Sequence, residues 1–76
     1  MLILYTKNNC PYCEKVKRVF AERRLTYEER NIADEQFLNE VRALGAKTMP
    51  FMHDTTANVA MGESDDIIDY ASEYSF

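Results

Sequence analysis

Residues 2–13 read LILYTKNNCPYC and contain a strand, a short connection and the first residues of a helix. The apolar run Leu2–Thr6 is typical of a strand buried on both faces of a sheet. Lys7, Asn8 and Asn9 end this strand. Pro11 then fits the first turn of a helix, where its missing N–H group costs nothing. The stretch therefore predicts a strand followed at once by a helix, as at the start of an α/β domain.

Hydrophobic spacing and turn residues predict the remaining elements in the order β-α-β-α-β-β-α. These are a helix from Pro11 to about Arg23, a strand over 26–32, a helix from an Asp34 N-cap to about Leu44, strands over 51–53 and 58–61 joined by a turn at 54–57, and a last helix capped by Ser64. Alternating strands and helices imply a partly parallel sheet, and the hairpin adds an antiparallel pair. We expect an α/β fold with a mixed four-stranded sheet and helices on both faces.

Composition narrows the function classes. The 76 residues include 9 Lys+Arg and 13 Asp+Glu, a formal net charge of −4, which argues against nucleic-acid binding. This length predicts one domain over residues 1–76. No apolar run approaches the ~20 residues needed to span a membrane. Met1–Tyr5 has neither a basic segment nor a small-residue cleavage site, so we expect a cytoplasmic protein.

The residues with chemical potential are Cys10 and Cys13, which stand three apart at the start of the first helix. A C-x-x-C motif beside a β-α-β pattern indicates a thioredoxin-like redox pair. Residues at this spacing are neighbours on a helix, so the two sulfurs can bond with little backbone movement. Unpaired N–H groups at the helix start stabilise a thiolate at Cys10, and Lys7 adds a positive charge. Cys13, one turn further, suits the role of a more buried partner.

Two other interpretations use the same cysteines. Tetrahedral zinc needs about four ligands. The chain has one histidine, His53, and no second cysteine pair, which disfavours a zinc site within one chain. An inert pair, and a metal or iron–sulfur cluster shared between two chains, stay open at this point.

The sequence resembles glutaredoxins along nearly its whole length. The resemblance rests on three motifs in the family's order: Lys7 with Cys10-Pro11-Tyr12-Cys13, then Lys47-Thr48-Met49-Pro50, then Gly62-Glu63-Ser64-Asp65-Asp66-Ile67. It implies a thioredoxin-like fold and a glutathione-dependent dithiol-disulfide oxidoreductase, with Cys10 as the nucleophile and Cys13 as the resolving cysteine.

The same resemblance implies a glutathione groove. Lys7 and Tyr12 match residues that line it, and Lys47 lies near its rim. Thr48, Met49 and Pro50 match a Thr-Val-Pro motif with a cis proline, and Ser64 and Asp65 match the helix start that binds the γ-glutamyl end. Glutathione is then a reducing co-substrate, no prosthetic group is bound, and a monomer acts on disulfide-containing proteins. Ribonucleotide reductase is a partner typical of the family.

One departure from the family pattern keeps two other functions in view. Gly62 is followed by Glu63, where the family usually has a second glycine, and a carboxylate there can weaken glutathione binding. One alternative is a hydrogen donor that thioredoxin reductase recharges. The other is a non-enzymatic carrier in which two chains bridge an iron–sulfur cluster. Pro11 disfavours the carrier, because it stiffens the turn that would face the cluster.

Overall fold

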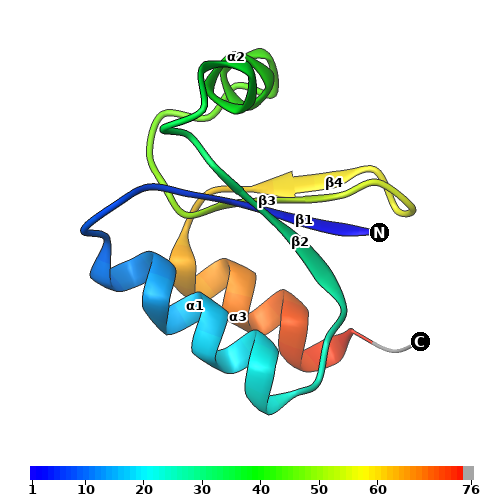
Figure 1. Cartoon of the computed structure of the whole chain (residues 1–76). Coiled ribbons are helices and arrows are strands. Elements are labelled where there is room, and N and C mark those ends of the chain that lie inside the picture. Colours follow the sequence, from blue (N-terminus) through cyan, green and yellow to red (C-terminus); the bar gives the residue numbers. More distant parts are fainter. Residues whose placement is uncertain (75–76) are drawn as a thin grey trace.

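The computed structural model describes residues 1–74 and confirms the predicted order of elements (Figure 1). The elements are β1 (Leu2–Thr6), α1 (Pro11–Glu22), β2 (Tyr27–Asn31), α2 (Glu35–Ala43), β3 (Phe51–Asp54), β4 (Val59–Met61) and α3 (Ser64–Glu73). No helix within residues 1–74 has both the length and the apolar character needed to cross a bilayer.

The four strands form one mixed sheet in the order β2-β1-β3-β4. β1 pairs in parallel with β2 and antiparallel with β3, and β3 pairs antiparallel with β4. All residues of β1 are buried. The expectation of a central first strand is therefore confirmed, and the sheet has the predicted mixture of parallel and antiparallel pairs.

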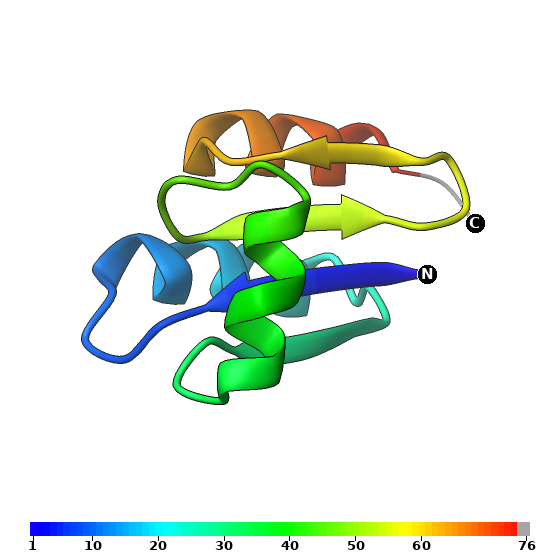
Figure 2. The same ribbon diagram turned by 90° about the horizontal axis from the view of Figure 1, so that it is seen from above.

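Helices cover both faces of this sheet, so β1 contributes to two cores. Figure 1 shows α1 and α3 side by side on one face and α2 on the other, and Figure 2 shows α2 running across the strands. Successive side chains of a strand point to opposite faces. Leu2 and Leu4 accordingly belong to the core under α1 and α3, whereas Ile3 and Tyr5 belong to the core under α2.

The strand register defines two ends of the molecule. Tyr5 pairs with Phe51 at one end of β1, and Leu2 pairs with Asp54 at the other. The first is named the cysteine end, because the chain continues from Thr6 to Cys10 and because Met49 and Pro50 precede β3 there. The second is named the Asp54 end. α1 and α3 both begin at the cysteine end, where an ion pair of 3.4 Å joins Lys15 to Asp65.

Two local predictions are wrong. Ser64 is not the N-cap of the last helix but its first helical residue. The cap position belongs to Glu63, whose backbone is extended and whose side chain makes no capping hydrogen bond. Asp54 does not start the turn of the hairpin. It is the last residue of β3 and is 3% exposed, because its carboxylate finds hydrogen-bond donors inside the fold.

Candidate active site

The two cysteines form a disulfide at the start of α1, with their Cα atoms 5.2 Å apart. Cys10 is the N-cap residue of this helix, and the backbone N–H of Cys13 donates a hydrogen bond to Cys10 Sγ over 3.1 Å. A sulfur that accepts a backbone N–H at a helix N-terminus is favoured in its charged form. The geometry therefore suits Cys10 as the thiolate when the pair is reduced.

Both cysteine residues are buried, Cys13 slightly more than Cys10. Cys10 is 5% exposed and Cys13 only 1%, so Cys13 faces the interior more completely. Cys10 Sγ lies 3.9 Å from the carbonyl oxygen of Met49, in the segment that leads into β3. The peptide bond between Met49 and Pro50 is cis, as the family resemblance implied. The chain segments 10–13 and 49–50, far apart in sequence, thus meet at Cys10.

A groove of about 540 Å³ lies at this meeting point. Its walls contain all of the predicted glutathione-binding residues, namely Lys7, Tyr12, Thr48, Met49, Pro50, Ser64 and Asp65. These side chains come from the loop after β1, from α1, from the segment before β3 and from the start of α3. Tyr12, between the two cysteines, is 63% exposed and stands at the groove rather than in a core. Lys47 is not a wall residue of this groove and lies in a neighbouring pocket.

The structure adds Gly62 and Glu63 to the predicted wall. Gly62 packs closely against Phe51, because a Cβ atom at this position would lie 3.2 Å from Cδ2 of Phe51 and would require that ring to shift by a few tenths of an ångström. This contact has no signal in the sequence beyond the glycine itself. Glu63 is an acidic residue at the α3 side of the groove, where Asp65 also lines the wall. Asp65 pairs with Lys15, but both side chains are largely exposed, so this ion pair contributes little to stability.

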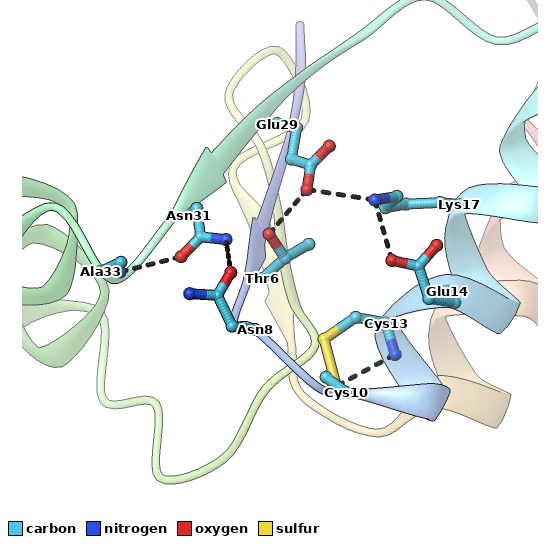
Figure 3. Close-up of polar contacts among 9 residues, drawn as sticks. All are labelled: Thr6, Asn8, Cys10, Cys13, Glu14, Lys17, Glu29, Asn31 and Ala33. Atoms are coloured by element: carbon cyan, nitrogen blue, oxygen red, sulfur yellow. Dashed lines mark hydrogen bonds and ion pairs between the residues drawn. A yellow bond between two sulfur atoms is a disulfide. The ribbon is translucent and has the colours of Figure 1, made fainter.

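Hydrogen bonds between β2, β1 and α1 fix the frame around the disulfide (Figure 3). Glu29 accepts a hydrogen bond from the buried hydroxyl of Thr6 over 2.8 Å and pairs with Lys17 of α1 over 3.4 Å. Lys17 also contacts Glu14 at 3.1 Å. The hydrogen bond to Glu14 is the main reason that the pKa of Lys17 is raised, against an opposing effect of burial. The contact between Lys17 and Glu29 ties the middle of α1 to the sheet.

The loop between β1 and α1, which leads to Cys10, is also fixed by a contact with the end of β2. Asn31 donates a side-chain hydrogen bond to Asn8 over 3.0 Å and accepts one from the backbone N–H of Ala33. Asn9 has a φ of 56°, a left-handed conformation that asparagine tolerates better than most residues. The chain can therefore turn from β1 into α1 within a few residues and present Cys10 at the helix start.

Comparisons with known proteins agree with this geometry. A family model described as "Glutathione S-transferase, N-terminal domain" matches residues 4–74. Glutaredoxin 1 of Rickettsia felis is 31% identical over 78 residues, with 95% of this chain and 72% of that protein covered. The chain belongs to the glutaredoxin family, and its residues 4–74 belong to the family of glutathione S-transferase N-terminal domains.

Two further comparisons place this glutaredoxin among small thioredoxin-fold proteins. The "Glutaredoxin-like protein NrdH" of Lactococcus lactis subsp. lactis (strain IL1403) is 33% identical over 51 residues, which cover 66% of this chain and 71% of that protein. The crystal structure of the thioredoxin-like protein BC3987 superimposes with a TM-score of 0.81 at 18% identity, over 93% of this chain and 99% of that one. The fold is thioredoxin-like, and the family relationship makes the chain a thiol-disulfide oxidoreductase.

Proposed function

We propose that this glutaredoxin reduces protein disulfides and glutathione mixed disulfides, with Cys10 as the nucleophile, Cys13 as the resolving cysteine and glutathione as the electron source. The Cys10 thiolate attacks a substrate disulfide, forms a mixed disulfide and releases one substrate thiolate. Cys13 then attacks Cys10 Sγ, releases the second substrate thiolate and leaves the Cys10–Cys13 disulfide. One glutathione thiolate then attacks Cys10 Sγ, which releases the Cys13 thiolate and leaves glutathione bonded to Cys10. A second glutathione thiolate attacks that mixed disulfide, so that glutathione disulfide departs and the Cys10 thiolate is restored.

The single observation that supports this proposal best is the composition of the groove beside the disulfide. Chain segments from four parts of the sequence supply its walls, and every predicted glutathione residue is among them. Met49 links the groove to the reactive sulfur, since its carbonyl oxygen lies 3.9 Å from Cys10 Sγ. A thiol-bearing tripeptide bound in this groove would have its sulfur next to Cys10.

The charges along the groove suit a molecule with a carboxylate at each end. Lys7 stands on the β1 side and can attract the glycyl carboxylate. At the other side, the first N–H groups of α3 receive no side-chain cap from residues 1–74, so they can donate to the γ-glutamyl carboxylate. Ser64 and Asp65 stand at the same helix start, and Asp65 suits the γ-glutamyl amine.

Two observations support thioredoxin reductase as an alternative electron source: the residue Glu63 and the name of a relative. Glu63 lines the groove, where its charge opposes a bound carboxylate. The lactococcal relative is named glutaredoxin-like protein NrdH rather than glutaredoxin. The alternative proposal is therefore a hydrogen donor that thioredoxin reductase recharges, with the same roles for Cys10 and Cys13.

Substrate and location follow from the proposed chemistry. Disulfide-containing proteins are the proposed substrates, and ribonucleotide reductase, a partner typical of the family, is the first to test. The cytoplasm is the proposed location, because glutathione and thioredoxin systems keep thiols reduced there.

Turnover of a small mixed disulfide separates the two electron sources. The assay supplies electrons either from glutathione with glutathione reductase or from thioredoxin reductase, at equal protein concentration. We expect faster turnover with glutathione. Turnover that depends on thioredoxin reductase and is absent with glutathione would support the alternative, and absence of turnover with both would contradict the oxidoreductase roles of Cys10 and Cys13.

A further inference from the structure

A second pocket adjoins the active-site groove on the α2 side. Its volume is about 240 Å³, and it shares Lys7, Thr48 and Met49 with the groove. Two further cations reach it, Arg42 from the last turn of α2 and Lys47 from the segment that follows. The remaining walls are aliphatic, and none of the wall residues is acidic. We refer to it as the basic pocket.

The basic residues of the second half of the chain are concentrated at this pocket. Residues 39–76 contain seven acidic side chains but only two basic ones, and both of these, Arg42 and Lys47, line the basic pocket. Neither of them, nor Lys7, forms an ion pair or a side-chain hydrogen bond with a residue among 1–74. By contrast, Lys15, Lys17 and Arg30 are each paired with carboxylates. The three cations of the basic pocket are therefore available to a ligand.

Glutathione alone does not account for three available cations. It presents one carboxylate to this side of the groove, and Lys7 already lines the groove itself. A polypeptide substrate extends beyond the cysteine that Cys10 attacks, and its neighbouring residues continue from the groove into the space beside it. The opposite side of the groove carries two acidic residues, Glu63 and Asp65, and none of the described residues that line it there is basic. The charges thus differ between the two sides of the reactive cysteine.

We propose that the basic pocket is a subsite for protein substrates, which binds acidic side chains on one side of the substrate's reactive cysteine. This inference rests on the proposed function, since it assumes that Cys10 forms a mixed disulfide with the substrate. Complementary charges at the rim of an interface raise the association rate and select partners more than they raise affinity. The subsite therefore acts on the rate of the first attack, in which the Cys10 thiolate bonds to the substrate sulfur and the partner thiolate departs.

The test measures how fast the reduced protein is oxidised by symmetric disulfides of three short peptides. One peptide carries two glutamates before its cysteine, one carries them after it, and the third has glutamines at all of these positions. We expect one acidic peptide, and not both, to react about threefold faster than the glutamine peptide, the order expected for two exposed charge pairs. The preference should shrink as salt is raised.

Variants assign the preference to the pocket. In the double variant Arg42→Gln with Lys47→Gln, which keeps only Lys7 of the three pocket cations, the rate ratio between the preferred acidic peptide and the glutamine peptide should fall towards one. The matched control is Arg18→Gln, which removes a charge from an exposed position of α1 outside the basic pocket and the groove. The control should keep the wild-type ratio.

Two outcomes would overturn the inference: no preference for either acidic peptide in the wild type, or a preference that is undiminished in the double variant. A small uncharged disulfide measured in parallel separates this failure from that of the proposed function. If the small disulfide oxidises the protein normally, only the subsite is wrong. If no disulfide oxidises it, the proposed function fails and the subsite with it.

Discussion

The polar groups at the two ends of the sheet differ in how many partners they have within the fold. At the Asp54 end, the carboxylate of Asp54 accepts hydrogen bonds from the hydroxyl of Tyr70 over 2.5 Å and from the backbone N–H of Thr56 over 3.0 Å, and it lies 3.9 Å from the N-terminal ammonium. At the cysteine end, Lys7 forms no ion pair with a described residue and the first N–H groups of α3 have no side-chain cap. The Asp54 end satisfies its buried carboxylate within the fold, whereas the cysteine end has a cation, Lys7, without an ion-pair partner among residues 1–74.

This difference separates stability from function along one sheet. A buried carboxylate needs several donors, and Asp54 draws them from the chain terminus, the hairpin turn and α3, so it joins elements. A binding groove requires donors and charges that are preorganised but not yet satisfied. Changes at the cysteine end should therefore alter chemistry with little effect on folding, whereas changes at the Asp54 end should do the reverse.

The largest effect is expected from the two cysteines. Cys10→Ser should abolish all disulfide exchange, because it removes the sulfur that meets the groove at Met49. Cys13→Ser should keep activity towards glutathione mixed disulfides, which need one thiol, and lose most reduction of protein disulfides. Turnover of both substrate types by both variants checks this division. Equal losses on both substrates would refute it.

The second prediction concerns the charge state of Cys10 in the reduced protein. Its sulfur accepts the N–H of Cys13 at a helix start, which favours the thiolate. We expect the thiolate of the Cys13→Ser variant to form at least about two pH units below the ~8.5 of a free cysteine. Absorbance near 240 nm followed against pH measures this. A midpoint near that of a free thiol would show that the helix start does not activate Cys10.

Cys10 and Cys13 could be identified from the sequence, because the pattern that marks them lies within one short stretch of chain. The C-x-x-C spacing, Pro11 and the preceding apolar strand lie within 12 consecutive residues, so short-range rules fix their arrangement. The boundaries of α1 and α2 and the cap at Asp34 follow equally local patterns and are confirmed. The gathering of Lys7, Thr48 and Ser64 in one groove was predictable only through the family resemblance.

What the sequence did not show depends on tertiary packing. Aspartate is common in turns, so the sequence around Asp54 predicts a turn. Only the pairing of β1 with β3 and the packing of α3 bring Leu2 and Tyr70 next to Asp54. Arg42 reads as an ordinary basic residue in the last turn of a helix. Its proximity to Lys47, in a half of the chain otherwise rich in acids, was the one available signal for the basic pocket.

At the Asp54 end, we expect Tyr70→Phe to lower the free energy of unfolding by about 1.5–3 kcal/mol, the range for a hydrogen bond to a charged group. Burial alone would raise the pKa of Asp54, but the hydrogen bonds from Tyr70, Ala57 and Thr56 outweigh it and lower that pKa. The same bond raises the pKa of Tyr70 to about 12. Disulfide exchange should be unchanged in this variant.

The loss of unfolding free energy in Tyr70→Phe should depend on pH in a defined direction. A carboxylate with a lowered pKa stabilises the fold above the ordinary value of ~3.9, and this contribution is lost as pH falls through the lowered value. The difference between wild type and Tyr70→Phe should therefore be full at neutral pH and shrink below about pH 4. Denaturant unfolding at several pH values measures it. Tyr27→Phe is the matched control, since the Tyr27 hydroxyl makes no hydrogen bond with residues 1–74. An equal loss in the control, or one independent of pH, would contradict the assignment.

The smallest effect is expected at Glu63, the acidic exception at the cysteine end. Its extended backbone does not require glycine, so Glu63→Gln isolates the charge while Glu63→Gly restores the family residue. Removing an exposed repulsion worth ~0.2–1 kcal/mol should lower the KM for glutathione by up to about fivefold at low salt. The gain should shrink as salt is raised. A KM that is unchanged or higher in Glu63→Gln would show that Glu63 does not repel glutathione.

The central claim, that Cys10 exchanges disulfides with glutathione while Cys13 resolves the product, has a direct test in the covalent intermediate. The reduced Cys13→Ser variant is mixed with glutathione disulfide, and the modified residue is located by peptide mass spectrometry under non-reducing conditions. We expect one glutathione per chain, attached to Cys10, and none on the Cys10→Ser variant treated in the same way. An unmodified Cys10 in the first variant, or equal modification of Cys13 in the second, would contradict it.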